Sequence, residues 1–524
     1  MSVDNVKPDG LPDGIGSQAE SKPVTAEDRP GPARYPRLRG ALRGHLPFVV
    51  AMVAAAVLRV VVMLGYPSAM FFPDSYSYLA DALTGVPDST RGNGYPFFLR
   101  MLMPLHSFAL VTGLQALMGL AMGALIYAVL RRRGLPGWGA TLCALPVLFD
   151  AYELAMEHMI SSDVLFYTLV TVAVALLCFW DTPPWGVVVF AGLITGYAAS
   201  VRNIGEAMLI LVVAGMIARR MGWKRIVAAA AAGVVPIAGY MIWYHSFTGQ
   251  YAMNEAGPFL YSRVQSFAEC SRMNPPPDLR FLCDPRPAGQ REFSQAYLWA
   301  PDQPLMKAAG GKNQKEFTPQ FSKASKQFAE LAIESQPLSY ARTAVADTLT
   351  SFDWNRVDAN NAWGNLMGTG GLYQFARHGG ALPWWITPAT NQAKAAADFS
   401  NSANYGVTRV TQPWASFLWL YQHVFLRGPV LLVIIVIGAA GVIGRLRRRA
   451  WRERRWGGIG LLPWLVGASL VVLPPMTAGF SYRYILAAVP SLCLAAGLAF
   501  AGQRNLVTCL KSRRGKSEDM AKEA

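Results

Sequence analysis

The chain has 524 residues, of which 52% are hydrophobic and only 15% are charged. Soluble domains carry roughly 25% charged residues, so this composition excludes an ordinary soluble protein and indicates that several apolar segments face lipid. The net charge of +16 does not indicate nucleic-acid binding, because the lysines and arginines cluster between apolar runs, as in the cytoplasmic loops of membrane proteins.

Residues 1–44 are rich in proline, glycine, aspartate, serine and arginine without apolar periodicity, which predicts a disordered basic tail. The apolar run that follows starts too late for an ordinary signal peptide and lacks a convincing cleavage site, so we expect a membrane helix. Because about 20 apolar residues cross the hydrocarbon core, the sequence predicts an all-α polytopic fold with about ten transmembrane helices. The expected spans are 46–64, 107–130, 137–153, 161–180, 185–201, 204–218, 226–244, 428–444, 458–475 and 483–502.

The positive-inside rule orients these spans. The basic clusters between spans and after the last one lie at 131–133, 219–225, 445–455 and 504–524. All of them fall on the side of the N-terminus, and the inverted topology would translocate every one. We therefore expect a protein of the bacterial plasma (inner) membrane with both termini in the cytoplasm. The first loop, 66–106, and a long segment, 245–427, are then external.

The spans and the long segment define the expected domains. Seven helices occupy 45–244, an external mixed or mainly helical subdomain at 245–427 precedes the eighth helix, and three helices occupy 428–503. The inserted segment is too long for a loose loop and should fold. It contains Cys270 and Cys283, for which an oxidising compartment would permit a disulfide, although sequence does not fix the geometry that a disulfide needs.

Asp74 is the most informative residue of the first loop. It lies in FFPDSYSYLADAL just after the first span, at the boundary between membrane and water, where polar groups are costly and tend to be functional. Two interpretations remain open. Asp74 is either a base that takes the proton of an acceptor hydroxyl or the N-cap of the short helix predicted for SYSYLADALTG.

A second acidic group lies in DAYELAMEHMISSD, where the third and fourth spans join. It includes Glu157, one helical turn after Glu153, and Asp163, which opens the fourth span and is again either functional or a cap. The spacing matches no metal-binding pattern, so no metal ligand is assigned. Four carboxylates and a histidine nevertheless leave a divalent cation open as a cofactor.

Two arginines lie on the predicted external side, against the positive-inside bias: Arg202 in SVRNIGE and Arg483 in GFSYRYILAAVP. A bound phosphate would offset the cost of placing a guanidinium there. The alternatives are snorkelling or a buried carboxylate partner, for which Glu206 is one turn from Arg202. His245 in WYHSFTG is the best placed of the external histidines.

Four segments together resemble the membrane glycosyltransferases of the GT-C class. The closer likeness is to bacterial members of the protein O-mannosyltransferase and aminoarabinose-transferase type, including the domain shared with rhizobial lipopolysaccharide glycosyltransferases. PDSYSYLADAL with the later GYPFFL is similar to the first-loop acidic motif, and ISSDVLFYTLVTVAVALL is similar to the opening of the fourth span. AGLITGYAASVRNIG resembles the fifth-span motif, and SYRYILAAVPSLCLAAGLAF resembles the last span. The resemblance covers about 46–250 and 428–503.

This resemblance implies inverting transfer of a monosaccharide from a polyprenyl-phosphate carrier to an external glycan, lipid or protein. Asp74 would be the catalytic base, Arg483 with Arg202 would bind the donor phosphate, and Asp163 would be the second acidic position. Further candidates for substrate binding are Glu157, Tyr78, Tyr95 and His245. Ser75 stands where the family often has a second acid, which puts metal dependence in doubt.

Two other classes of protein would also have about ten helices and external arginines: a transporter or flippase of lipid-linked glycans, and an O-antigen ligase-like protein. Transporters more often have helices broken at midplane and polar residues deep in several spans, whereas here the polar groups gather at one external face. No Rossmann glycine fingerprint is present, so no nucleotide-sugar site is expected. The 245–427 segment resembles nothing we can name and is expected to select the acceptor.

Overall fold

The computed structural model describes residues 35–308, 317–354, 375–377, 391–401, 408–453 and 458–501. The chain divides into two compact units, Met1–Gly44 and His45–Ala524. Helix α1 runs over Tyr35–Gly65 and therefore begins inside the stretch predicted to be a disordered tail. The rest of that stretch, 1–34, and the predicted C-terminal tail, 504–524, lie outside the described residues.

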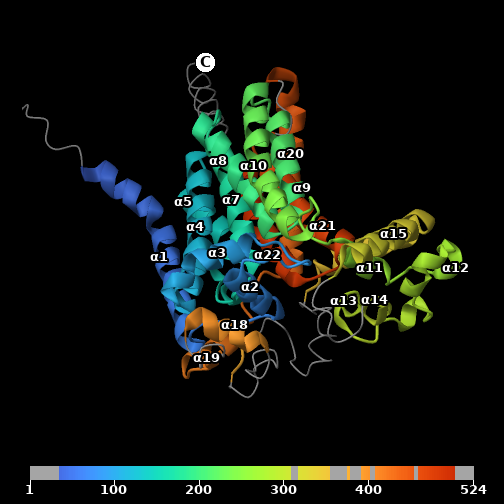
Figure 1. The fold of residues 1–524 in the computed structure, drawn as a ribbon. Helices are drawn as coiled ribbons and strands as arrows, with labels where there is room; N and C mark the ends of the chain where they lie inside the picture. The colour runs from blue at the N-terminus through green and yellow to red at the C-terminus, as the bar shows by residue number, and fades with distance from the viewer. Residues whose placement is uncertain are drawn as a thin grey trace, which may run out of the picture. The chain divides into compact units, whose positions relative to one another are not determined.

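Every regular element in the described part of the chain is a helix, apart from one isolated bridge between Met70 and Met159 (Figure 1). Apolar helices of the bundle, beside α1, are α4 (Phe108–Arg132), α5 (Gly137–Phe149), α6 (Ala151–Glu157), α7 (Ser162–Phe179), α8 (Trp185–Val201), α9 (Ile204–Ala218), α10 (Trp223–Thr248), α20 (Gly428–Glu453), α21 (Leu461–Thr477) and α22 (Tyr482–Phe500). The all-α expectation is confirmed for the residues that the structure describes.

Within the described ranges, five helices are long and apolar enough to cross a membrane: α4, α7, α10, α22 and the Gly44–Gly65 part of α1. Helices α5 and α6 qualify together as one span bent by 56° at Asp150. The other four predicted spans coincide with the shorter apolar helices α8, α9, α21 and Gly428–Gly444 of α20. The chain is therefore a multi-pass membrane protein whose described part has five or six candidate full-length spans, and ten crossings stay a prediction.

The loop after the first span, 66–106, folds back onto the end of the helix bundle. It contains α2 (Pro73–Thr84), α3 (Gly94–Leu102) and the 3-10 helix η1 (Met103–Leu105). The backbone of Met70 accepts from the Ile160 amide at 3.0 Å and donates to the His158 carbonyl at 2.9 Å. The Ser75 hydroxyl donates to the Ile160 carbonyl at 2.6 Å. These bonds fix the start of α2 beside the start of α7.

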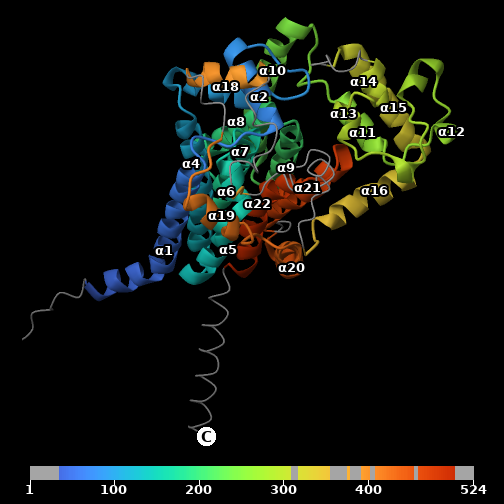
Figure 2. The same ribbon diagram turned by 90° about the horizontal axis from the view of Figure 1, so that it is seen from below.

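The described part of 245–427 is also helical. Its helices are α11 (Gly257–Val264), α12 (Cys270–Met273), η2 (Pro277–Leu282), η3 (Ala288–Gln290), α13 (Ala296–Trp299), α14 (Pro304–Ala308), α15 (Pro319–Ser335), α16 (Pro337–Thr350), α18 (Asn391–Ser400) and α19 (Trp414–Tyr421). Helices α11 to α15 group to one side of the bundle in two views (Figures 1 and 2) and bury a hydrophobic cluster of their own around Tyr261 and Phe328. A disulfide joins Cys270 to Cys283 in this group. The domain boundaries at 245 and 427 stay predictions.

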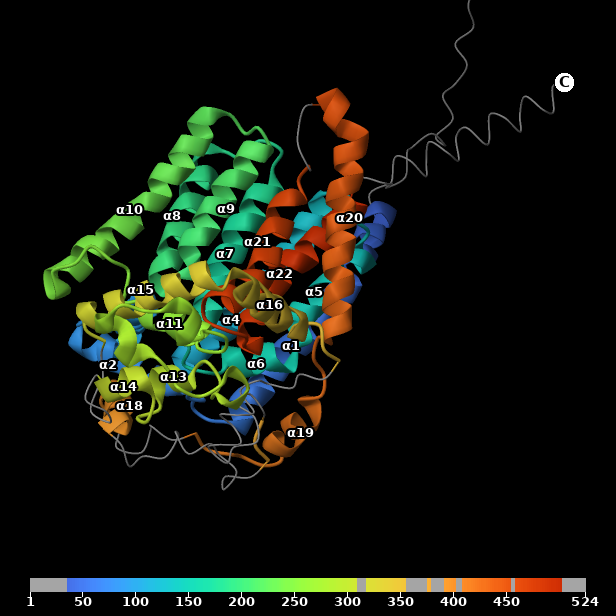
Figure 3. The ribbon, with the colours of Figure 1, turned by 90° about the vertical axis from the view of Figure 1, so that its right-hand side faces the viewer.

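Small residues allow close packing between α8 and α10, which lie side by side in Figure 3. A Cβ on Gly196 would lie 2.0 Å from the Gly233 carbonyl oxygen, and one on Gly192 would lie 2.2 Å from the Ala229 carbonyl oxygen. Without a hydrophobic driving force between lipid-exposed helices, such close backbone approach supplies much of the packing energy. This contact holds the C-terminal end of α8, where Arg202 follows.

We expect Gly196→Val to force α8 and α10 apart and to lower the free energy of unfolding by about 1–3 kcal/mol, as overpacking does. Thermal unfolding of the purified protein in lipid nanodiscs measures the change. The control is Gly239→Val on α10, where an added Cβ would meet nothing within 4 Å. Equal stability of the two variants would show that the close contact contributes little.

Candidate active site

Asp74 lies at the start of α2, but it does not cap the helix. The N-cap position is Phe72, and Asp74 is the second helical residue. Its carboxylate is turned instead toward two arginines that come from distant parts of the chain. One oxygen accepts from Arg91 at 2.7 Å, and the other accepts from Arg483 at 3.3 Å. The capping alternative left open by the sequence is therefore not what the structure has.

Asp163 occupies the matching position on α7. Ser161 is the N-cap, and its hydroxyl also donates to the Asp163 carboxylate at 2.6 Å. Arg202 donates to the other carboxylate oxygen. Arg483 Nη1 lies 3.8 Å from Asp163 as well, so it links the two carboxylates. Arg202 thus pairs with Asp163 and not with Glu206, the partner one turn away that the sequence offered.

These residues lie where the starts of several helices meet. Asp74, Asp163 and Arg483 are each the second residue of their helix, and Arg202 lies two residues before α9. The amino-terminal ends of helices carry partial positive charge and unpaired amides, which favour anions. We call Asp74, Arg91, Asp163, Arg202 and Arg483 the charge cluster.

Aromatic rings enclose the charge cluster. The Arg483 guanidinium carbon lies 4.8 Å from the centroid of the Phe72 ring and 5.3 Å from that of Tyr484, which also carries Arg202 at 5.1 Å. The side chains of the cluster are between 5% and 19% exposed. Charges at this depth are screened less than surface charges, so the ion pairs are strong, and each charge depends on its partners.

The arginines determine the ionisation of Asp74. Burial by itself raises the pKa of this carboxyl, but the charge of Arg91, followed by those of the other two arginines, outweighs burial and lowers the pKa to about 2. Asp74 is therefore ionised at every physiological pH. All three arginines are paired to carboxylates, so an incoming anion competes with a carboxylate for them.

Arg91 was not identified from the sequence. It lies between α2 and α3 and is held by Asp88 at 3.1 Å and by the Thr90 hydroxyl at 3.1 Å in addition to Asp74. A usable signal existed, because Arg91, like Arg202 and Arg483, is an arginine on the predicted external side. It lies in the STRGNGYP segment between the two parts of the first-loop motif.

Tyr78 and Tyr95 lie next to the charge cluster and connect it to the bundle. The Tyr78 hydroxyl lies 2.9 Å from the Ser162 hydroxyl, beside Asp163 in sequence, and its ring packs edge-on against Tyr95. The Tyr95 hydroxyl donates to the Gln115 side chain at 2.7 Å. Both rings are buried, so they pack between the charge cluster and the interior of the helix bundle.

Glu157 and His245 are not in the charge cluster. Glu157 forms a buried ion pair of 2.5 Å with Arg59 of α1, inside the bundle. His245 lies in the last turn of α10 and stacks on Tyr251 with 4.0 Å between ring centroids. Within the described ranges, no group of three or more His, Cys, Asp or Glu side chains is arranged to hold a metal ion.

Solved structures of two membrane transferases are among those similar to this chain. The S. cerevisiae protein O-mannosyltransferase Pmt1–Pmt2 complex bound to the sugar donor matches with 16% identity and a TM-score of 0.33, over 43% of this chain and 36% of that one. The Archaeoglobus fulgidus oligosaccharyltransferase in the apo form matches with 11% identity and a TM-score of 0.40, over 89% of this chain and 52% of that one. No protein-family model and no curated protein sequence matches the chain.

Both of these proteins are GT-C glycosyltransferases, the class that the four sequence segments resemble. The chain spans about a third to a half of the length of the chains it matches. At these TM-scores the likeness is partial, and the function proposed below rests on the residues of this chain.

We expect Arg91→Gln to raise the pKa of Asp74, because the effect of burial is then opposed by two arginines instead of three. Infrared difference spectra between pH 7 and pH 4 should show a protonated carboxyl in this variant and none from Asp74 in the wild type. The double variant Arg91→Gln/Asp74→Asn identifies the band. Identical titrations of wild type and Arg91→Gln would mean that Arg91 does not control the carboxylate.

Proposed function

We propose that the protein is an inverting glycosyltransferase that moves a monosaccharide from a polyprenyl-phosphate carrier to an acceptor on the external face of the membrane. The observation that carries the proposal is the Asp74 carboxylate held between Arg91 and Arg483 at the end of an apolar helix bundle. This arrangement combines an ionised base, positive charge for a phosphate and an apolar surface for a lipid.

The reaction needs a proton acceptor and a stabilised leaving group. The acceptor hydroxyl oxygen attacks the anomeric carbon, its proton passes to Asp74, and the bond between that carbon and the phosphate oxygen breaks. The departing polyprenyl phosphate gains one negative charge as it leaves. Arg483 and Arg202 stabilise that developing charge. Their interaction with the phosphate is stronger in the transition state than in the bound donor.

The ion pairs of the free protein indicate how donor binding would raise the basicity of Asp74. A donor phosphate that accepts from Arg483 draws this arginine away from its Asp74 oxygen, 3.3 Å distant in the free protein. Arg91 keeps the other oxygen, because Asp88 and Thr90 hold it in place. One carboxylate oxygen then faces the acceptor with fewer positive charges near it, and its basicity rises.

The charge cluster would lie on the external side in the topology proposed from the basic clusters. Lipid-linked sugars then reach it by diffusion in the outer leaflet, and the apolar helix surfaces contact the polyprenyl chain. Asp163 holds Arg202 in position for the phosphate.

Asp74→Asn should lower the rate of transfer about 10²–10⁴-fold, the usual contribution of a general base. The measurement is consumption of labelled polyprenyl-phosphate sugars by membranes that contain equal amounts of folded protein. The matched control is Asp181→Asn, which removes an exposed aspartate with a side chain 81% accessible.

Two results would contradict this assignment in different ways. Full activity of Asp74→Asn would support the proposed enzyme and reject Asp74 as its general base. Movement of a lipid-linked sugar between leaflets, without consumption of any donor by the wild type, would favour the transporter alternative.

The proposed orientation predicts the labelling of Cys270 and Cys283. In intact spheroplasts, a membrane-impermeant maleimide should label these cysteines only after treatment with a reductant that does not cross the membrane, because they form a disulfide. The variant Cys270→Ser/Cys283→Ser is the control for the labelled band. Labelling that requires membrane permeabilisation would invert the topology.

A further inference from the structure

Trp299, from the external segment, contacts the charge cluster. It is the last residue of α13, and the Arg91 guanidinium carbon lies 5.4 Å from the centroid of its ring. The same guanidinium donates to Asp74 at 2.7 Å. Trp299 is only partly buried, so part of the ring is accessible. One aromatic ring of the segment expected to select the acceptor thus lies one side chain away from the candidate base.

The stretch that leads to Trp299 lies close to two segments of the site. An added Cβ on Gly479, four residues before Arg483, would lie 3.7 Å from the Gln295 amide nitrogen and 3.9 Å from the Ser294 hydroxyl. On the other side, the Phe317 amide donates to the Ser89 hydroxyl at 3.0 Å, two residues before Arg91. The external segment therefore contacts both chain segments that supply arginines to Asp74.

Polar groups accompany the ring. The Ser294 hydroxyl and the side-chain amide of Gln295 take part in no hydrogen bond with other residues of the described ranges. Both side chains are partly exposed. A partly exposed aromatic ring beside an available hydroxyl and an available amide is the composition of a site that binds a ligand with one apolar face and several hydroxyls.

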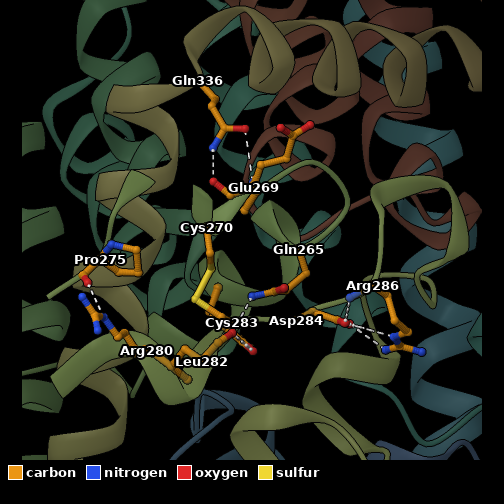
Figure 4. Close-up of a disulfide and its surroundings, with 12 residues drawn as sticks. Gln265, Glu269, Cys270, Pro275, Arg280, Leu282, Cys283, Asp284, Arg286 and Gln336 are labelled. Carbon is orange, nitrogen blue, oxygen red and sulfur yellow. Dashed lines mark hydrogen bonds and ion pairs between the residues drawn. A yellow bond between two sulfur atoms is a disulfide. The ribbon is translucent and has the colours of Figure 1, made fainter. Parts of the chain in front are cut away.

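A hydrogen-bond network and a disulfide lie next to α13, and Figure 4 shows the disulfide with the neighbouring Asp284–Arg286 pair. The Tyr297 hydroxyl donates to Asp284, and Arg286 donates to the same carboxylate at 2.7 Å. Burial raises the pKa of Asp284, but these hydrogen bonds outweigh it and lower the pKa to about 2, so the network stays charged at neutral pH. Cys283, next to Asp284, is tied to Cys270 by the disulfide. Binding groups held by such a network lose little entropy when a ligand binds.

We propose that Ser294, Gln295 and Trp299 form an acceptor subsite that takes a carbohydrate ring. The inference rests on the proposed glycosyl transfer and narrows its acceptor to a glycan. The apolar C–H face of the sugar stacks on the indole, and its hydroxyls bond to Ser294 and Gln295. Its position beside Arg91 places an acceptor hydroxyl near Asp74.

The test is direct binding of saccharides to the full-length protein in lipid nanodiscs. The probes are methyl hexosides, methyl pentosides and their disaccharides, with a peptide rich in serine and threonine and a diacylglycerol as the other acceptor classes. We expect at least one saccharide to bind the wild type, and Trp299→Ala to weaken this binding about tenfold. Trp299→Tyr keeps an aromatic face and should restore most of the affinity.

The control is Trp138→Ala, which removes an exposed tryptophan at the start of α5 and should leave saccharide affinity unchanged. Equal affinity of wild type and Trp299→Ala would overturn the subsite, as would binding of only the peptide or only the diacylglycerol.

Donor consumption by the wild type is measured separately. Saccharide binding that depends on Trp299, without consumption of any donor, would keep the subsite and reject the proposed transfer. Donor consumption with Trp299-independent acceptor binding would keep the transfer and reject the subsite.

Discussion

The ion pairs between Asp74 and the arginines on either side of it are the constraint on which the rest of this structure depends. A carboxylate that is mostly withdrawn from water is stable in its ionised form only when cations and hydrogen-bond donors surround it. Here the cations come from the first loop and from the start of α22. The loop, the last helix and, through Asp163, the starts of α7 and α9 must therefore all be placed correctly for any one of these charges to be satisfied.

Hydrogen bonds, close helix packing and a second ion pair hold the segments that carry these charges. Backbone hydrogen bonds at Met70 join the loop to the α6–α7 connection, and the Ser75 hydroxyl adds a further bond to it. Glycines let α8 approach α10 closely, which holds the α8 end next to Arg202. Deeper in the bundle, Arg59 and Glu157 form a separate ion pair, and their 2.5 Å contact offsets the free-energy cost of burying both charges. The acidic group at the α6–α7 join is thus divided between a structural pair inside the bundle and the charge cluster at its end.

A site in which every arginine is already paired has a consequence for ligand choice. A phosphate competes with a carboxylate for a guanidinium, since its oxygens match the guanidinium geometry and carry full charge. The position of Arg91 and its contact with Trp299 connect this exchange to the 245–427 segment, so that the proposed acceptor and donor sites share one arginine.

The sequence by itself determined the apolar segments, the all-α class and four residues of the charge cluster, because hydrophobic length and a charge in an apolar context are local properties. It missed Arg91, and it could not assign partners to Asp74, which is 17 residues from one arginine and 409 from the other. It also grouped Glu157 and His245 with the site, although Glu157 pairs with Arg59 and His245 stacks on Tyr251. Whether an aspartate at a helix start caps the helix or turns to an arginine depends on what lies opposite. Only the tertiary structure decided this, because the partners come from the α2–α3 connection and from the start of α22, which meet Asp74 only after the chain has folded.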